Sequence, residues 1–197
     1  MKIIDLEPNT PEWLTWRKNK ICASDSGIIL DYSPFTTRKE LQALKLGFVD
    51  PKPPSKWMLR GHDLEPIARE IFEERMGLRF PPLIIESEKT PFMGASLDGM
   101  NLDNNLLLEI KCPGKINSHL NLLEEGQEIS YAYFTQIQHQ LYCAEAEMCF
   151  YVSYHPDDPD KIIVKEVLPD VEFTERMIEA ERYFWEKNIL LMEPVEI

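Results

Sequence analysis

The sequence predicts an α/β (α+β) fold in a single domain over residues 1–197. Segments with apolar residues at helical spacing alternate along the chain with short apolar segments of the kind that form strands. The length of 197 residues is enough for one domain with a buried core. The contents of 44% hydrophobic and 28% charged residues are ordinary for a globular protein.

The first quarter of the chain predicts three helices. Thr10 before Pro11 is typical of a helix start, because a hydroxyl caps the helix and Pro suits the first position. Small hydroxyl residues at 21–27 indicate either an anion site of free backbone N–H groups or an ordinary N-cap. In order, we expect an extended start at residues 1–8, a helix from 10, a helix from 21–27 through 30, a helix at 35–46, and a mobile proline-rich loop at 47–55.

The first of these helices carries Trp13, Arg17 and Lys20 on one face. Packing in the core is the simpler explanation for the tryptophan. The alternative is that Trp13 lies beside a nucleic-acid end, where stacking on a base is worth about 1–3 kcal/mol. Both explanations stay open at this point.

Residues 57–76 give the strongest helical pattern, and Gly77 is a typical residue to end it. Pro66 inside this pattern predicts that the regular helix starts close to it, which places Glu65 in the first turn. An acid favoured by the helix dipole explains Glu65 as well as a functional role does. We expect His62 at the surface or in packing.

The rest of the chain alternates between strands and helices. The helix expected at 130–144 carries an unusual density of amides, including Gln136, Gln138 and Gln140, which predicts contacts to phosphates or to a metal-bound water, or else a plain helix surface. The other expected elements are strands at 82–87, 92–95, 147–155 and 161–168, a partly helical polar segment at 118–128, and a helix at 174–191.

Residues 96–113 predict a β-hairpin with a polar turn at 101–105. Because strand side chains alternate, Glu109 and Lys111 point to one face, and pairing brings Asp98 beside Glu109. Two carboxylates and an ammonium at the end of an apolar hairpin are costly unless something compensates them. Magnesium or manganese would do so, since both prefer hard oxygen ligands, and Lys111 would then position or deprotonate a bound water.

The formal net charge of −13 at first disfavours nucleic-acid binding, because proteins that bind nucleic acids are usually basic. Binding depends on where the charges lie, however, and basic residues gather at 17–20 and near 52–60. A local basic lining on an acidic body would suit an enzyme that must release its polymer and move on.

The four cysteines show no C-x-x-C spacing, so the sequence indicates neither a zinc site nor a disulfide framework. No apolar segment approaches the roughly 20 residues of a membrane span, and we expect neither a signal peptide nor a membrane partner.

The combination Ser-Leu-Asp-Gly and Leu-Leu-Glu-Ile-Lys-Cys-Pro at residues 96–99 and 107–113 resembles the catalytic motif of the PD-(D/E)XK nuclease superfamily. The local sequence of these two segments resembles the phage lambda exonuclease and YqaJ-type viral recombinase family. The similarity covers nearly the whole chain in matching order, at residues 13–17, 21–24, 60–61 with 65–69, 98–99, 109–113 and 133–138. It implies a restriction-endonuclease-like core, with a mixed central β-sheet flanked by helices.

By this resemblance, Asp98 and Glu109 bind two divalent ions, magnesium or manganese, and Glu65 supports them from its helix. Lys111 handles the attacking water and Gln136 helps to orient it. These five residues make up the catalytic set that the resemblance implies.

The resemblance also implies a pocket for the 5′-phosphate of the digested strand, formed by Arg17, Ser24 and Ser96. Met58 is a candidate for the apolar side chain that separates the duplex end. The chain departs from the superfamily motif at Leu97, where a proline would precede the aspartate; this position contributes backbone geometry, so the departure puts little in doubt.

The activity implied is a metal-dependent 5′→3′ exonuclease that acts on double-stranded DNA ends and leaves 3′ overhangs. A ring-shaped homotrimer, a single-strand annealing protein as partner, and the cytoplasm of a bacterial host follow from the same resemblance. The alternatives are an endonuclease of the same fold, an iron–sulfur nuclease, which the scattered cysteines oppose, and a non-catalytic DNA-end-binding module, which the intact hairpin motif opposes.

Overall fold

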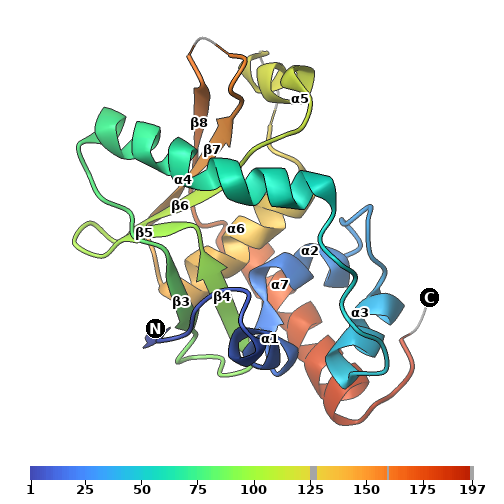
Figure 1. Ribbon diagram of the computed structural model, residues 1–197. Coiled ribbons are helices and arrows are strands. Elements are labelled where there is room, and N and C mark those ends of the chain that lie inside the picture. The colour runs from blue at the N-terminus through green and yellow to red at the C-terminus, as the bar shows by residue number, and fades with distance from the viewer. Residues whose placement is uncertain (125–127, 159, 196–197) are drawn as a thin grey trace.

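The computed structural model describes residues 1–124, 128–158 and 160–195, whose strands form two mixed four-stranded sheets flanked by helices (Figure 1). The predicted α/β fold is confirmed. The strands are β1 (Lys2–Ile4), β2 (Ile21–Cys22), β3 (Leu83–Glu86), β4 (Met93–Leu97), β5 (Gly99–Asn101), β6 (Leu106–Lys111), β7 (Met148–Tyr154) and β8 (Ile162–Val167). The helices are α1 (Pro11–Lys18), α2 (Ala23–Ile29), α3 (Arg38–Leu46), α4 (Lys56–Met76), α5 (Ile116–Leu120), α6 (Tyr131–Ala144) and α7 (Val171–Tyr183), with a short 3₁₀ helix (Asn121–Leu123) and a π-helical segment (Phe184–Leu190).

The two sheets meet at one residue of the predicted hairpin. One sheet has the strand order β1-β3-β4-β2 and the other β5-β6-β7-β8. The pairs β2–β4 and β6–β7 are parallel and the other pairs are antiparallel. Only Asp98 separates β4 from β5, so the chain passes from one sheet to the other at Asp98.

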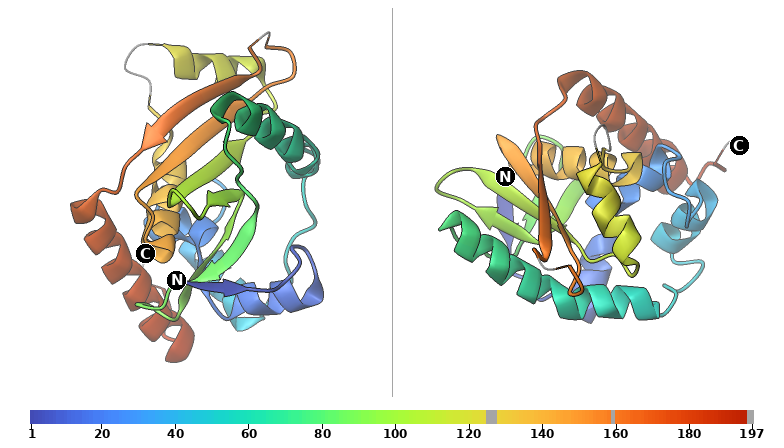
Figure 2. Two further views of the ribbon diagram at one scale, coloured as in Figure 1. Left: turned by 90° about the vertical axis from the view of Figure 1, so that its left-hand side faces the viewer. Right: turned by 90° about the horizontal axis from the view of Figure 1, so that it is seen from above.

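Helices cover both faces of the β5–β8 sheet, with α4 on one side, α6 on the other and α7 beyond α6 (Figure 2). Leu108 and Ile110 of β6 pack into the same cluster as Phe72 of α4. Leu107 packs into a second cluster with Ile137 of α6. Because side chains alternate along a strand, Glu109 and Lys111 share the face of Leu107 and α6.

The prediction that the regular helix starts near Pro66 is wrong. Helix α4 is capped by Ser55, whose hydroxyl accepts a hydrogen bond from the backbone, and it continues through Pro66, so Glu65 lies inside the helix. Pro66 removes one backbone donor, which weakens the helix without ending it. Arg60 holds the N-terminal half in place, since its Nη1 donates to the carbonyl of Cys112 at 3.2 Å.

The C-terminal helix begins at Val171, capped by Asp170, slightly before the predicted start. Part of the predicted polar segment, residues 125–127, lies outside the described residues. Among the helices that the structure describes, none is long and apolar enough to cross a membrane.

Candidate active site

Asp98 is fixed at the junction of the two sheets by bonds to two other elements. Its Oδ2 accepts a hydrogen bond from the backbone N of Ile110 in β6 at 2.7 Å. Its backbone carbonyl accepts one from Nε of Arg69 in α4 at 2.9 Å. The carboxylate therefore lies against the end of β6, where the hairpin pattern places it.

Glu109 is only 1% exposed, and both of its carboxylate oxygens are held by the protein. Oε1 accepts from the ammonium of Lys111 and from Nε2 of Gln136 at 2.7 Å. Oε2 accepts from Nε2 of Gln140 at 2.6 Å. The two amides lie one turn apart on α6 and fix the plane of the carboxylate.

The electrostatics of this cluster favour an additional cation. Burial, followed by repulsion from Glu109, raises the pKa of Asp98 well above its ordinary value. Burial opposes the charged form of Lys111, but Glu109 and Asp98 outweigh it and raise its pKa. Two carboxyl groups thus face one ammonium in a poorly solvated place, and the raised pKa of Asp98 means that a cation beside it, either a proton or a metal ion, is favoured.

Gln140 provides an independent observation on whether the residues beside Glu109 fit a metal ion. Its Oε1 is, within the part of the chain that the structure describes, the only fully buried side-chain N or O atom without a hydrogen-bond partner. Buried polar atoms nearly always have a partner, which is often a water or an ion. An amide oxygen suits a hard cation or water held by one, so the donor set fits magnesium or manganese in its chemistry.

Glu65 faces the same region but is turned toward its own helix. Its carboxylate pairs with Arg69 in the next turn of α4. Burial raises the pKa of Glu65 despite this guanidinium, and the charge of Glu109 adds to the effect. Across the described ranges, no three acidic, histidine or cysteine side chains are arranged to hold a metal ion, so Glu65 as a ligand stays a prediction.

The residues predicted to bind a phosphate lie together. Nη2 of Arg17 donates to Oγ of Ser24 at 2.9 Å, and its guanidinium lies 4.7 Å from the ring centre of Trp13. Nε1 of Trp13 donates in turn to Oγ of Ser96 at 3.0 Å. Ser96 precedes Asp98 by two residues, so this cluster, which we call the Arg17 cluster, comes within two residues of Asp98 along the chain.

Met58 is 65% exposed in the first turn of α4, beside the half-exposed Trp57 and Leu59. The role of Met58 at the duplex end stays a prediction.

Gln140 is the residue of this site to which the sequence pattern gives no separate role. The signal available is its spacing of four residues from Gln136, which places both amides on one face of the helix. Gln138 behaves differently: its side chain bonds the carbonyl of Leu168 at 2.9 Å and the N–H of Asp170 at 2.8 Å. It thereby fastens the connection between β8 and α7.

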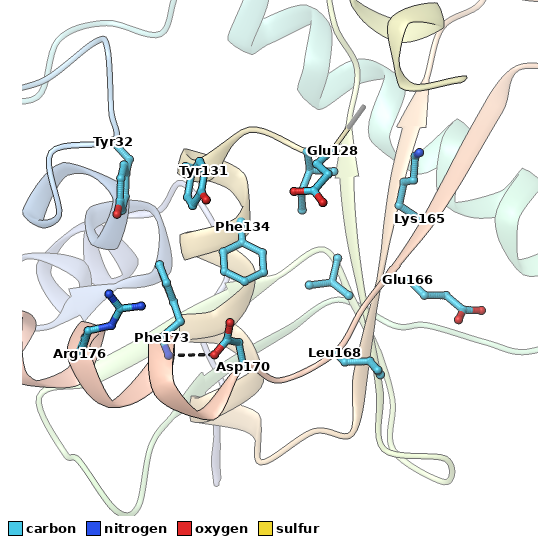
Figure 3. Close-up of a pocket in the computed structure, with 12 residues that line it drawn as sticks. Tyr32, Glu128, Tyr131, Phe134, Lys165, Glu166, Leu168, Asp170, Phe173 and Arg176 are labelled. Carbon is cyan, nitrogen blue, oxygen red and sulfur yellow. Dashed lines mark hydrogen bonds between the residues drawn. The ribbon is translucent and has the colours of Figure 1, made fainter. Parts of the chain in front are cut away.

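A cavity of about 640 Å³ lies elsewhere on the molecule, between α6, the end of β8 and the start of α7 (Figure 3). Its lining combines exposed tyrosines with charges of both signs, and the predicted site residues do not line it. The labelled residues of this cavity include Tyr32, Tyr131, Phe134, Lys165, Phe173 and Arg176.

A family model described as the YqaJ-like viral recombinase domain matches residues 12–147, which contain every predicted site residue. The chain is 31% identical over 188 residues to the uncharacterized protein YqaJ of Bacillus subtilis (strain 168), covering 93% of this chain and 58% of that protein. It is 26% identical over 172 residues to an uncharacterized protein of Acanthamoeba polyphaga mimivirus, covering 81% and 31%. The chain thus spans 58% and 31% of the lengths of these two relatives.

The fold is also similar to solved exonuclease structures. An alkaline exonuclease (LHK-Exo) from Laribacter hongkongensis superposes with a TM-score of 0.76 at 25% identity, covering 90% of this chain and 92% of that one. The same exonuclease in complex with dAMP gives a TM-score of 0.75 at 25% identity, covering 93% and 96%. A phage-related exonuclease from Haemophilus somnus 129PT gives 0.66 at 15% identity, covering 88% and 96%, and so supports the fold alone.

Proposed function

The chain belongs to the family of YqaJ-like viral recombinase domains, and on this basis we propose that it is a metal-dependent 5′→3′ exonuclease of double-stranded DNA. It would leave 3′ single-stranded overhangs for recombination. The observation that carries the proposal is the meeting of Asp98, Glu109 and Lys111 at the end of one hairpin. The similarity to an exonuclease at 25% identity over nine-tenths of this chain supports it.

Asp98 and Glu109 are the residues that would hold magnesium or manganese, with Glu65 and the amide oxygen of Gln140 close to the same region. When bound, such ions lower the pKa of a water and stabilise negative charge on the phosphate, and in many nucleases two ions share this work. The protein supplies the fixed carboxylates, because Gln136 and Gln140 hold Glu109 in one orientation.

Lys111 is assigned to positioning and charge stabilisation. Its pKa is raised, so its ammonium stays protonated near neutral pH and is a poor acceptor for the proton of the attacking water. As a donor, it orients that water and offsets the negative charge that grows on the phosphate oxygens. Gln136 and Lys111 both donate to Oε1 of Glu109, and Gln136 thereby keeps the carboxylate fixed beside the ammonium.

The Arg17 cluster would bind the phosphate at the 5′ end of the digested strand. A guanidinium and two hydroxyls form charge-assisted hydrogen bonds with a phosphate, and Trp13 would support the adjoining base. Since the cluster adjoins Asp98, a phosphate held there places a phosphodiester near the carboxylates and sets the direction of digestion. By family resemblance, we propose DNA ends as substrate, a homotrimer, and a single-strand annealing protein as partner.

The test of this function compares three substrates in magnesium and in EDTA. A linear duplex with 5′-phosphates, the same duplex with 5′-hydroxyls, and closed circular DNA are incubated with the protein. We expect rapid digestion of the phosphorylated duplex, slow digestion of the hydroxyl duplex, intact circles, and no reaction in EDTA. Cutting of circles would indicate an endonuclease, and binding without any cutting would indicate a DNA-end-binding module.

A further inference from the structure

A buried lysine joins the chain segments that carry Arg17 and Ser24. The side chain of Lys45, in α3, is 6% exposed. Its Nζ donates to the carbonyl of Arg17 at 2.8 Å and to the carbonyl of Lys20 at 2.6 Å. It also pairs with Oδ2 of Asp25 at 2.6 Å, so all three N–H groups of the ammonium have partners.

Asp25 extends this connection into the start of α2. The carboxylate is 7% exposed, and its Oδ2 also accepts a hydrogen bond from the backbone N of Cys22 at 2.8 Å. Ser24 lies between Cys22 and Asp25 in the chain. Burial alone would raise the pKa of Asp25, but Lys45 and Arg17 outweigh it and lower the pKa, so Asp25 stays ionised.

The ion pair therefore fixes the end of α1 relative to the start of α2. Arg17 comes from the first of these segments and Ser24 from the second, and their side chains meet at 2.9 Å. Lys45 bonds the backbone of Arg17, which leaves the guanidinium of Arg17 available to the surface. Besides Lys45, the carbonyl of Arg17 accepts only a long contact from Sγ of Cys22, at 4.0 Å, among the bonds that tie it to the start of α2 in the described part of the chain.

Stability is a weak reason for such a pair, because desolvation of two buried charges offsets most of their attraction. Precise positioning of nearby groups is a better explanation for this buried pair, because hydrogen bonds to a phosphate need their donors held to within about 0.5 Å. We propose that the Lys45–Asp25 pair positions Arg17 and Ser24 for the 5′-phosphate and so sets the preference for phosphorylated ends. The proposal rests on the proposed function and makes Lys45 a positioning residue, since it does not itself reach the phosphate.

The experiment uses Lys45→Met, the double variant Lys45→Met with Asp25→Asn, and Lys39→Met as control. Lys39 is an exposed lysine on the same helix. The double variant avoids an unpaired buried carboxylate, which is the main reason why Lys45→Met alone would unfold. For each protein, kcat/KM in magnesium and Kd in EDTA by fluorescence anisotropy are measured on the same duplex with 5′-phosphate and with 5′-hydroxyl ends.

We expect both Lys45 variants to lose about ten-fold or more of the wild-type preference for 5′-phosphate, because charge-assisted hydrogen bonds to the phosphate are weakened. Values for the hydroxyl duplex should change little, and Lys39→Met should keep the full preference. An equal loss on both duplexes would indicate structural support only and overturn the proposal, as would an unchanged preference in the folded double variant. A wild-type protein that digests DNA without any preference would instead remove the phosphate pocket from the proposed function, and the role of Lys45 with it.

Discussion

At the scale of single residues, the site depends on the charge of Lys111. Lys111→Ala removes the ammonium that pairs with Glu109 and leaves Gln136 and Gln140 in place to hold the carboxylate. We expect cleavage to fall by about 10²–10⁴-fold, the range for a positioned proton-handling or charge-stabilising group. Single-turnover digestion measures the rate, and anisotropy in EDTA should show DNA binding retained.

The control for this prediction is Lys115→Ala, which removes an exposed lysine in the turn after β6. It should digest DNA at the wild-type rate. If Lys111→Ala also cleaves at that rate, the assignment of the site is wrong.

Alternation along β6 predicts that Glu109 and Lys111 share a face, and pairing across the hairpin predicts that Asp98 lies beside them. Asp98, Glu109 and Lys111 lie together as the hairpin pattern predicts, because strand geometry fixes the direction of every second side chain. Lys45 and Asp25 carry no such pattern. Their contact depends on how α3 packs on α1 and α2, and the spacing of residues along the sequence does not predict how helices pack together.

At the scale of elements, two buried amides of α6, Gln140 and Gln138, have different roles. Gln140→Leu removes a donor to Glu109 together with the orphaned Oε1, so we expect slower cleavage with a free energy of unfolding within about 1 kcal/mol of wild type. Gln138→Leu is the matched control, since Gln138 bonds the backbone of Leu168 and Asp170 and accepts a hydrogen bond from Oγ1 of Thr174 at 3.3 Å, all of them outside the site. It should lower stability and leave the rate of the folded protein unchanged. Thermal unfolding and single-turnover digestion measure both, and the reverse pattern would contradict the role of Gln140.

The same helix carries a buried charged pair with α7. His139 faces Glu181 through Nδ1 at 3.0 Å and the carbonyl of Gly94 through Nε2 at 3.0 Å, and Ser26 donates to Glu181. Burial alone would lower the pKa of His139, but Cys143 and Glu181 outweigh it and raise it well above its ordinary value. The folded chain therefore binds this proton more tightly than the unfolded chain.

This proton makes stability depend on pH in a definite direction. The contribution is complete below a pH of about 6.5, the pKa of an unperturbed histidine, and is lost as the pH rises through the raised pKa. We expect the stability advantage of wild type over His139→Gln to be larger at pH 6 than at pH 9. Urea unfolding at both pH values measures it, and an advantage that grows with pH would show that His139 is neutral in the fold.

Some helix boundaries can be predicted from the sequence, because capping residues set them. Others cannot, because contacts with distant parts of the chain set them. Thr37 and Gly47 bound α3 by a capping box and a left-handed residue with a φ of 73°, both readable from the sequence. The start of α4 is not readable in this way, because Pro66 suggests a boundary that Ser55 and the Arg60 contacts override. The division into two sheets at Asp98 is likewise set by pairing between distant strands.

At the scale of the whole molecule, the net charge of the chain is opposite in sign to the two side chains that are proposed to contact phosphates. The formal net charge of the chain is −13, whereas Arg17 and Lys111 each lie where a phosphate is proposed to sit. Repulsion from the body and attraction at the site together favour brief contacts at DNA ends over tight binding along the duplex. Under the proposed function, the positions of Arg17 and Lys111, and not the net charge, decide the contact with DNA.

Under the proposed function, this site digests one strand of a duplex from its 5′ end. The most direct measurement follows two copies of one duplex in magnesium, one labelled at the 5′ phosphate and one at the 3′ end. We expect the 5′ label to appear as mononucleotide at the earliest times and the 3′ label to remain in long products, with Asp98→Asn and Glu109→Gln releasing neither. Early release of the 3′ label, or release of the 5′ label by both variants at the wild-type rate, would contradict the proposed function.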